Sequence, residues 1–389
     1  MTGYDGVVLA APFSLVPERR SGKSTQRLFA EVLKGVLAKA GLDRRELDGL
    51  SVASFTLAPD PPVALVEHFG LSCRYVDGLA LGGASAIAAV RRAARMVAAG
   101  DVAAVAVLGA DRNDEGTFAA LVEGFSRFAR EAVWPYGAGG PNAVFALITE
   151  HYMRRFGVRR EDFGALCVAQ RENAAGVPHA VFRDRRLTLD DYLAARPIAE
   201  PLSLYDCVMP VAGGEGCLVL READAVAAGL PFARLVATLE RYGAFADDPV
   251  QTRGGWVLER EGFWARAGVG PDAVDLVETY DDYPVMSFIQ LEDLGLCGKG
   301  EAAALMRERG FRRGEGLPHN TSGGQLSAGQ AGAAGGHLGL VEALRQVTGE
   351  AGGWQVAGAE LALVSGYGMA TYDRGLCAAA ALLAAGRRV

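Results

Sequence analysis

Two glycine-containing segments could bind the carbonyl oxygen of a ligand. Leu81-Gly82-Gly83-Ala84-Ser85 precedes an Ala- and Val-rich stretch, and Gly366-Tyr367-Gly368 follows an apolar run. Small residues allow close approach to the backbone, and the first turn of a helix leaves its N–H groups free to donate hydrogen bonds. Such donors can stabilise an oxyanion or an enolate. The same residues could equally serve only the tight packing of a helix on a strand.

Two lookalike motifs do not support nucleotide binding. Ser21-Gly22-Lys23-Ser24 resembles the end of a P-loop, but Pro17 stands where that motif requires its first glycine. The segment from Leu81 to Ala86 does not fit GxGxxG, so a dinucleotide fingerprint is not supported.

The composition is that of a globular protein with an ample core. Of its 389 residues half are hydrophobic and 22% are charged, which is too apolar for a disordered chain. The net charge of −7 argues against a nucleic-acid partner, because neutralising phosphates requires a clustered basic surface. No apolar stretch approaches the roughly 20 residues of a membrane-spanning helix, and the first apolar run is too short for a signal peptide.

The cysteines predict neither a metal site nor a disulfide framework. The six cysteines lie far apart, without a CxxC motif or a Cys/His cluster. The default expectation is therefore a reducing compartment, the cytoplasm, and no metal ion.

Helical and strand patterns alternate along the chain, which favours an α/β fold. A helix over 86–99 followed by a strand over 102–109 has a counterpart near the C-terminus. There, residues 333–336 open a helix to Val347, and a strand over 360–365 ends in Gly366. Any α/β protein repeats such units, but two at equivalent depth indicate a duplication. The elements predicted in the N-terminal part are a strand over 7–11, a helix over 26–40 capped by Ser24 or Thr25, a strand over 49–55, a helix over 86–99 and a strand over 102–109.

The duplication predicts a first half over residues 1–229 and a second half over 230–389. Residues 112–205 are richer in charge and aromatic side chains, with helix signals at 141–156 and 160–175. We expect them to form an insertion in the first half that carries a substrate wall or dimer contacts.

Several motifs resemble those of one known family. His319-Asn320-Thr321-Ser322-Gly323-Gly324 is followed by Leu326-Ser327-Ala328-Gly329, and Glu278-Thr279-Tyr280-Asp281-Asp282 precedes both. With Pro201-Leu202-Ser203-Leu204-Tyr205-Asp206-Cys207 and Gly83, they make the chain similar, over nearly its whole length, to the thiolase superfamily. The branch is that of sterol-carrier-protein thiolases and lipid-transfer-protein homologues. The resemblance implies a five-layered αβαβα fold from two duplicated halves, usually dimeric, with a CoA thioester bound between the core and the insertion.

The catalytic residues of thiolases are absent at the matching positions. Ala80 stands where the first glycine loop presents the nucleophilic cysteine, Gln330 stands where a histidine follows glycine, and Val364-Ser365-Gly366 lacks the second cysteine. The resemblance therefore implies no ordinary acyl-enzyme on cysteine. Cys73 and Cys207 are expected to be structural thiols.

The chain is also similar to a sub-branch of cysteine-free homologues that act as acyl-CoA retro-aldolases in sterol side-chain degradation. There, tyrosines occupy the altered positions; Tyr280 matches one of them, whereas Gln330 replaces the other. Retro-aldol cleavage of a β-hydroxyacyl-CoA needs a base for the hydroxyl proton and an oxyanion site for the enolate. It needs no cofactor beyond the coenzyme A of the substrate.

This resemblance assigns roles to the altered positions. Tyr280 would transfer the proton in surroundings that lower its pKa, with Asp281 orienting it or a water, unless Tyr280 is only a buried aromatic at a strand end. His319 could face the site or be a satisfied structural histidine. The expected site residues are Tyr280, Asp281 and Gln330 for catalysis, and Gly82, Gly83, His319, Gly366, Tyr367 and Gly368 for the oxyanion and substrate.

Two other functions stay open at this point. One is a thiolase-type acyltransferase, similar to acetyl-CoA acetyltransferase, with an unexpected nucleophile. The other is a non-catalytic acyl-CoA-binding subunit that completes a partner's site. Members of the branch often pair with a small zinc-ribbon/OB-fold (DUF35) protein, and nothing in this chain supplies that module. We therefore expect such a partner besides a homodimer.

Overall fold

The computed structural model describes residues 3–120, 130–137, 139–371 and 373–386. Within these ranges nine strands join in one large sheet, in the order β3-β2-β4-β7-β1-β8-β11-β10-β9. None of the helices in the same ranges has the length and apolar character that crossing a bilayer requires.

The first five strands of that order form the N-terminal half. β2 pairs in parallel with β3 and β4, whereas β7 pairs antiparallel with β4 and β1. β4 and β7 are buried almost throughout, as expected for strands covered by helices on both faces. The strands are β1 (Val7–Ser14), β2 (Gly49–Ala53), β3 (Tyr75–Leu79), β4 (Ala104–Arg112) and β7 (Ala212–Arg221).

The C-terminal half repeats this order. β9 pairs in parallel with β10, and β11 pairs antiparallel with β10 and β8. A parallel bridge between Val277 and His319 stands where β3 pairs with β2, so the duplication extends to the sheet edge. β1 and β8 pair antiparallel and join the halves. The strands are β8 (Phe232–Tyr242), β9 (Leu276–Thr279), β10 (Leu361–Ala370) and β11 (Gly375–Ala385).

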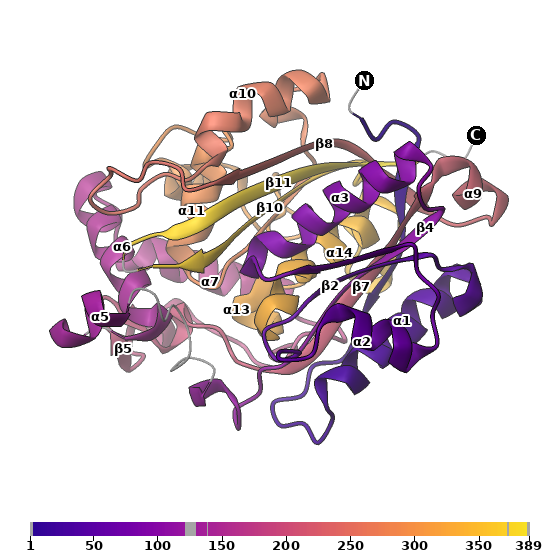
Figure 1. Cartoon of the computed structure of the whole chain (residues 1–389). Helices are drawn as coiled ribbons and strands as arrows, with labels where there is room; N and C mark the ends of the chain where they lie inside the picture. The colour runs from indigo at the N-terminus through magenta and orange to yellow at the C-terminus, as the bar shows by residue number, and fades with distance from the viewer. Residues whose placement is uncertain (1–2, 121–129, 138, 372, 387–389) are drawn as a thin grey trace.

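Two buried helices, α3 (Ser85–Ala99) and α14 (Gly335–Val347), lie side by side between the halves of the sheet (Figure 1). One core cluster of small side chains surrounds them and includes residues of strands from both halves. Further helices cover the two outer faces, so the predicted α/β class and five-layered αβαβα arrangement are confirmed. These outer helices are α1 (Thr25–Ala40) and α2 (Pro62–Phe69) on the N-terminal half, and α10 (Trp256–Ala267) and α11 (Pro284–Asp293) on the C-terminal half.

Local boundaries follow the sequence signals closely. Ser24 caps α1, because its hydroxyl oxygen accepts a hydrogen bond from the N–H of Arg27 at 3.2 Å. One expectation is wrong: the strand predicted over 360–365 continues to Ala370 as β10, so Gly366-Tyr367-Gly368 lie inside a strand and not in a loop. They stay in register with Ala379 to Cys377 of β11.

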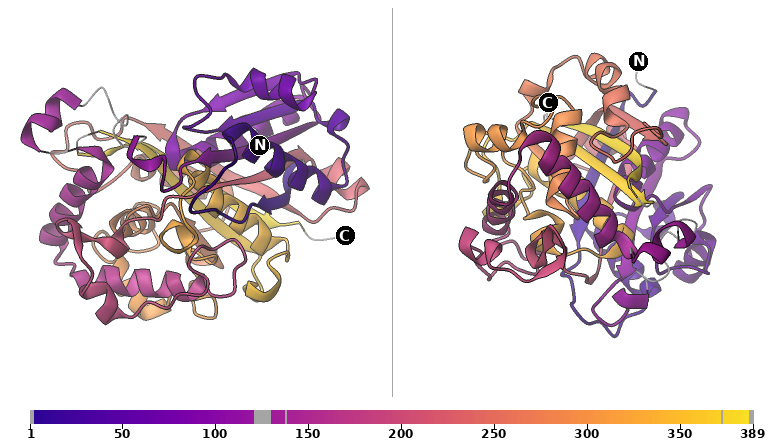
Figure 2. Two further views of the ribbon diagram at one scale, coloured as in Figure 1. Left: turned by 90° about the horizontal axis from the view of Figure 1, so that it is seen from below. Right: turned by 90° about the vertical axis from the view of Figure 1, so that its left-hand side faces the viewer.

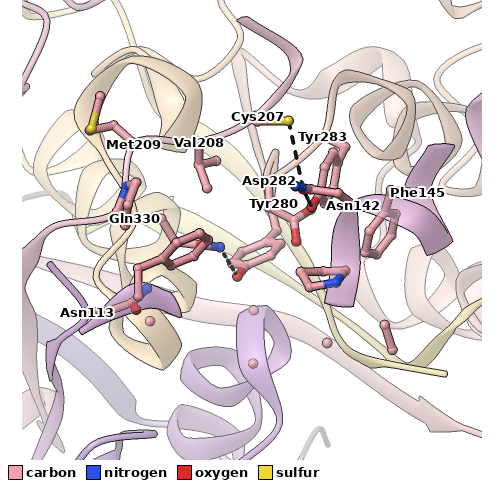
Figure 3. A pocket seen from close by; sticks show the side chains of 18 of the residues that line it. Asn113, Asn142, Phe145, Cys207, Val208, Met209, Tyr280, Asp282, Tyr283 and Gln330 are labelled. Carbon is pink, nitrogen blue, oxygen red and sulfur yellow. Dashed lines mark hydrogen bonds between the residues drawn. The ribbon is translucent and has the colours of Figure 1, made fainter. Parts of the chain in front are cut away.

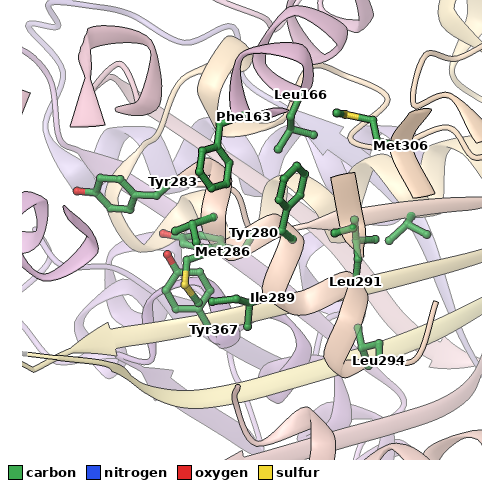
Figure 4. Close-up of a cluster of buried hydrophobic side chains, with 14 of the residues drawn as sticks. Phe163, Leu166, Tyr280, Tyr283, Met286, Ile289, Leu291, Leu294, Met306 and Tyr367 are labelled. Atoms are coloured by element: carbon green, nitrogen blue, oxygen red, sulfur yellow. The ribbon is translucent and has the colours of Figure 1, made fainter. Parts of the chain in front are cut away.

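The segment between β4 and β7 forms a lobe beside the C-terminal half (Figure 2). Its helices α6 (Gly140–Phe156) and α7 (Arg160–Asn173) confirm the two that the sequence predicts, and they pack on α11. Phe163, labelled in Figure 4, and Phe288 belong to one apolar cluster, with 5.3 Å between their ring centres. The expected insertion also covers residues 121–129, which lie outside the described ranges.

The remaining helices and strands are short. They are α5 (Arg130–Val133), α8 (Leu189–Leu193), β5 (Pro197–Ala199) and β6 (Leu202–Ser203) in the insertion, and α9 (Glu222–Ala227), α12 (Ala302–Arg309) and α13 (Gly324–Ala328) elsewhere.

Candidate active site

A cavity of about 300 Å³ lies where the carboxyl end of β9, the turn at Gly82–Ala84 and the inserted lobe meet (Figure 3). Its walls are mostly apolar, as in small-molecule sites generally. Of the expected site residues, Tyr280, Gln330, Gly82, Gly83, Tyr367 and Gly368 line the cavity, whereas Asp281, His319 and Gly366 do not. The polar side chains of the lining are Asn113, Asn142, Arg196, Cys207, Tyr280, Asp282, Tyr283, Gln330 and Tyr367.

Tyr280 directly follows β9, and its backbone is held from two sides. The N–H of Tyr280 donates to the carbonyl oxygen of Ser365 in β10 at 3.0 Å. The carbonyl oxygen of Tyr280 accepts a hydrogen bond from Gln290 Nε2 at 2.8 Å. Gln290 is a fully buried residue of α11, and its Oε1 accepts a hydrogen bond from Ser365 Oγ at 2.7 Å. These bonds fix the direction in which the Tyr280 ring leaves the strand.

The side chain of Tyr280 meets that of Gln330. Gln330 Nε2 donates a hydrogen bond to the phenol oxygen at 2.9 Å. The backbone of Gln330 is anchored by the mid-chain segment, because its N–H donates to Met209 O at 2.8 Å and its carbonyl accepts from Val211 N at 3.1 Å. The two residues that sequence analysis singled out, one from each catalytic motif, thus form a contact pair.

Burial and the negative charge of Asp282 raise the pKa of Tyr280 above its ordinary value, against the small lowering effect of Gln330. The expectation that the surroundings lower this pKa is therefore wrong. Tyr280 stays a phenol at neutral pH, and its oxygen already accepts the amide hydrogen of Gln330. Its own hydrogen is left to donate, so the group suits proton donation better than proton removal.

Asp281 does not orient Tyr280. Its carboxylate faces α13 and accepts hydrogen bonds from Gln325 N at 2.8 Å and Leu326 N at 3.3 Å. Burial raises its pKa to about 6. Asp281 thereby holds the short helix that precedes Gln330, and its influence on the cavity is indirect.

Asp282, the next residue, lines the cavity and was missed by the sequence analysis. Tyr367 donates a hydrogen bond from its phenol oxygen to Asp282 Oδ1. Burial, and next the charge of Asp281, raise the pKa of Asp282. Four further polar residues of the lining were missed, namely Asn113, Asn142, Arg196 and Tyr283, the last of which donates to Asn142 Oδ1 at 2.6 Å. Because the chain bends at Asp282, just after β9, no side-chain periodicity in the sequence could mark this residue.

His319 does not reach the cavity. It is fully buried, its Nε2 lies 2.8 Å from Thr279 Oγ1, and its ring packs 5.0 Å from that of Phe311. Burial lowers its pKa to about 3, so it is neutral. Of the two possibilities left open by the sequence, the structural histidine is the one that fits these contacts.

The glycines of the two segments let the halves of the protein approach each other. A Cβ on Gly366 would lie 2.2 Å from Gly83 O, and one on Gly368 would lie 1.7 Å from Leu81 O. On the other side of the same turn, a Cβ on Gly83 would lie 2.3 Å from Tyr280 Cδ2. Close packing alone accounts for Gly366, whereas Gly83 also makes room for the ring of Tyr280 in the cavity.

No cysteine of the cavity is prepared as a nucleophile. Cys207, the one thiol among the described lining residues, is half-buried, and burial raises its pKa to about 12. Its sulfur contacts Asn142 Oδ1 at 3.8 Å. Elsewhere in the described chain, no group of three or more His, Cys, Asp or Glu side chains is placed to hold a metal ion.

The chain has relatives that match most of its length. It is 33% identical over 369 residues to the 17-hydroxy-3-oxo-4-pregnene-20-carboxyl-CoA lyase of Mycobacterium tuberculosis, which covers 89% of this chain and 92% of the relative. It is 29% identical over 348 residues to the steroid side-chain-cleaving aldolase of Thermomonospora curvata, covering 85% and 87%.

Family and structural comparisons agree with these relatives. Residues 261–377 match the family described as thiolase C-terminal domain-like. The structure of an Ltp2-ChsH2(DUF35) aldolase superimposes with a TM-score of 0.86 at 27% identity and covers 100% of both chains. A monomeric SCP2-thiolase-like protein from Mycobacterium smegmatis shares the fold, with a TM-score of 0.74 at 18% identity over 98% of this chain and 78% of that one. The chain therefore belongs to the thiolase superfamily, in the sterol-carrier-protein thiolase branch that also holds the acyl-CoA lyases and aldolases.

Proposed function

We propose that this protein cleaves a carbon–carbon bond of a β-hydroxyacyl-CoA by a retro-aldol reaction, without an acyl-enzyme. The observation that carries the proposal is the hydrogen bond from Gln330 to the phenol oxygen of Tyr280 inside a mostly apolar cavity. It leaves a proton donor, held by backbone contacts from β10 and α11, where an enolate would form.

The reaction balances without any co-reactant. A base removes the proton of the β-hydroxyl group, the bond between the α and β carbons breaks, and its electron pair passes to the thioester as an enolate. The β carbon leaves as a ketone or aldehyde. Tyr280 donates its proton to the α carbon and so releases a shorter acyl-CoA. Preorganised donors toward the enolate are the main source of rate in such a site.

The named activities of the relatives support this class of reaction, because they are lyases or aldolases of acyl-CoA or steroid side chains. We propose a bulky, apolar acyl group, since the cavity walls are mostly apolar. By analogy with the Ltp2-ChsH2(DUF35) aldolase, we further propose that this chain works with a DUF35 partner. A homodimer is proposed from the family resemblance alone.

The acyltransferase alternative lacks a nucleophile in the cavity. The thiol of Cys207 has a pKa near 12, so almost none of it is thiolate at neutral pH, and thiolates are the reactive form. Ala80 cannot carry an acyl group.

The test is a panel of β-hydroxyacyl-CoA substrates, including steroid side-chain thioesters, given to the protein with its DUF35 partner. We expect two products by mass spectrometry, a carbonyl compound and a shorter acyl-CoA, with one solvent deuterium on the α carbon when the reaction runs in D₂O. Intact-mass spectra of the protein should show no adduct. Products that require free CoA, or an acylated protein, would establish the acyltransferase instead. No turnover of any substrate would leave the non-catalytic subunit.

A further inference from the structure

The carboxyl end of β9 places two functional groups on one side. Tyr280 and Asp282 both line the cavity, while Asp281 between them faces α13. The chain bends at Asp282 and Tyr283 after β9 ends, and both of these side chains line the cavity with Tyr280. Parallel strands present their carboxyl ends at ligand sites in α/β proteins. A phenol and a carboxylate two residues apart thus stand together at the cavity wall.

Tyr367 of β10 links these two groups. Its ring meets the edge of the Tyr280 ring at 90°, with 5.3 Å between the ring centres, and its phenol oxygen donates to Asp282 Oδ1. The ring of Phe145 packs 5.7 Å from that of Tyr367 and closes the other side. Because the hydrogen of Tyr367 is directed to Asp282, Tyr367 is not a proton donor to a ligand but holds the carboxylate in place.

Retro-aldol cleavage needs a group that accepts the hydroxyl proton as the carbon–carbon bond breaks, and a group that is already protonated cannot accept it. Tyr280 accepts the Gln330 hydrogen and stays protonated, so it fits the donor. Among the lining residues in the described chain, Asp282 carries the only carboxylate, and the lining holds no histidine or lysine. Tyr283 and Asn142 are bonded to each other, and Cys207 contacts the same Asn142 oxygen.

We propose that Asp282 is the catalytic base that accepts the β-hydroxyl proton, and that Tyr367 is its positioning residue. This inference rests on the proposed retro-aldol function. The hydroxyl proton passes to the carboxylate, the carbon–carbon bond breaks, and Tyr280 protonates the α carbon. The proton on Asp282 then returns to the Tyr280 phenolate through solvent, which restores the site. Burial makes the carboxylate a stronger base than one in water.

The first experiment removes the base. Asp282→Asn keeps the shape and an oxygen for Tyr367, and we expect kcat for cleavage to fall about 10³-fold with KM within about 3-fold, since a general base contributes roughly 10²–10⁴-fold. Asp282→Ala should regain activity in a saturable manner with added formate, a small carboxylate. The matched control is Asp281→Asn, whose activity, at whatever level, should not respond to formate.

The second experiment tests the positioning residue. Tyr367→Phe removes one hydrogen bond that favours the charged carboxylate, so the pKa of Asp282 should rise further. The acidic limb of the kcat–pH profile should then move to higher pH with KM unchanged. The titratable groups around Asp282 are Asp281, Tyr280, Tyr283, Tyr367 and Cys207.

The outcomes separate the two proposals. If the wild-type protein with its partner cleaves no β-hydroxyacyl-CoA, the proposed function fails. If the wild type cleaves its substrate and Asp282→Asn keeps turnover within about 3-fold, the base assignment alone is overturned. If Asp282→Asn is unstable, as judged by its melting temperature, an unmoved pH profile in Tyr367→Phe overturns the assignment by itself.

Discussion

Gln330 Nε2 lies 2.9 Å from the phenol oxygen of Tyr280, and the direction of this hydrogen bond sets the chemistry of the site. A side-chain amide nitrogen can only donate, whereas a hydroxyl group at the same position could donate or accept. Gln330 therefore fixes Tyr280 as a donor toward the cavity. Gln330 stands where the cysteine-free homologues have a second tyrosine, and the physical consequence of this difference is that Tyr280 donates its hydrogen to the cavity.

Changing the donor at position 330 should lower activity in a graded way. Gln330→Met keeps the length of the side chain and loses the hydrogen bond, so kcat/KM should fall about 10-fold, near the value of one neutral hydrogen bond. In Gln330→Glu kcat/KM should fall further, because the carboxylate would accept a hydrogen bond from the phenol and raise the pKa of Tyr280. Steady-state kinetics at one pH compare the two variants. A Gln330→Glu enzyme with wild-type kcat/KM would contradict the donor role.

Gly83 makes the room that the Tyr280 ring occupies. In Gly83→Ala the new Cβ would lie 2.3 Å from Tyr280 Cδ2, so the ring must shift from the position in which it bonds to Gln330. We expect kcat/KM to fall at least about 10²-fold, because a displacement of about 1 Å can cost that much. Gly353→Ala is the control, since nothing lies within 4 Å of a Cβ there. Equal activities of the two variants would show that the ring position does not matter.

The layers of the fold were predictable because each buried strand and small-residue helix has a local signature. α3, α14 and β4 were expected within a few residues of their observed bounds. The resemblance to thiolases then supplied the order of the layers, which periodicity alone could not. The error at Gly366-Tyr367-Gly368 has a physical cause: glycine usually ends strands, but here it allows a strand to cross a backbone turn without Cβ clashes.

The site was only partly predictable because two adjacent residues can point their side chains in different directions. Asp281 and Asp282 are identical in type and adjacent, yet the first caps α13 and the second lines the cavity. Sequence alone does not say which residue of the segment begins the turn after β9. The position of His319 was equally unpredictable from the sequence. Its hydrogen-bond partner is Thr279 of β9, 40 residues away in the chain, and the two meet only because His319 forms a bridge with β9 at the edge of the sheet.

Cys207 should be dispensable for turnover. The thiol is largely un-ionised because burial raises its pKa to about 12, and the retro-aldol reaction uses no thiolate. We expect Cys207→Ala to keep kcat within about 3-fold and KM within a similar range, because the substitution removes only a small lining group. Treatment of the wild type with substrate should add no mass to the peptide that holds Cys207. Loss of activity in Cys207→Ala, together with a mass adduct on this peptide in the wild type, would favour the acyltransferase function over the retro-aldolase.

Glu215 should make the stability of the protein depend on pH. It is buried in β7, where Ser14 Oγ donates to it, and Arg345 donates to Ser14 Oγ at 2.8 Å. Burial outweighs the attraction of Arg345 and raises the pKa of Glu215 to about 8. An unfolded glutamate titrates near pH 4.3. The folded state thus binds the proton more tightly, and the free energy of unfolding should fall as pH rises from about 4.3 to about 8.

Glu215→Gln isolates this contribution, because glutamine mimics the protonated side chain at every pH. Near pH 5 the variant and the wild type should melt at similar temperatures, and near pH 8.5 the variant should melt higher, by several degrees. Glu67→Gln on the exposed face of α2 is the control and should follow the wild type throughout. Thermal melts followed by circular dichroism at both pH values measure the difference. A variant that is destabilised equally at both pH values would mean that Glu215 is charged in the folded protein and stabilised by Arg345, and the predicted fall in stability between pH 5 and pH 8.5 would then be absent.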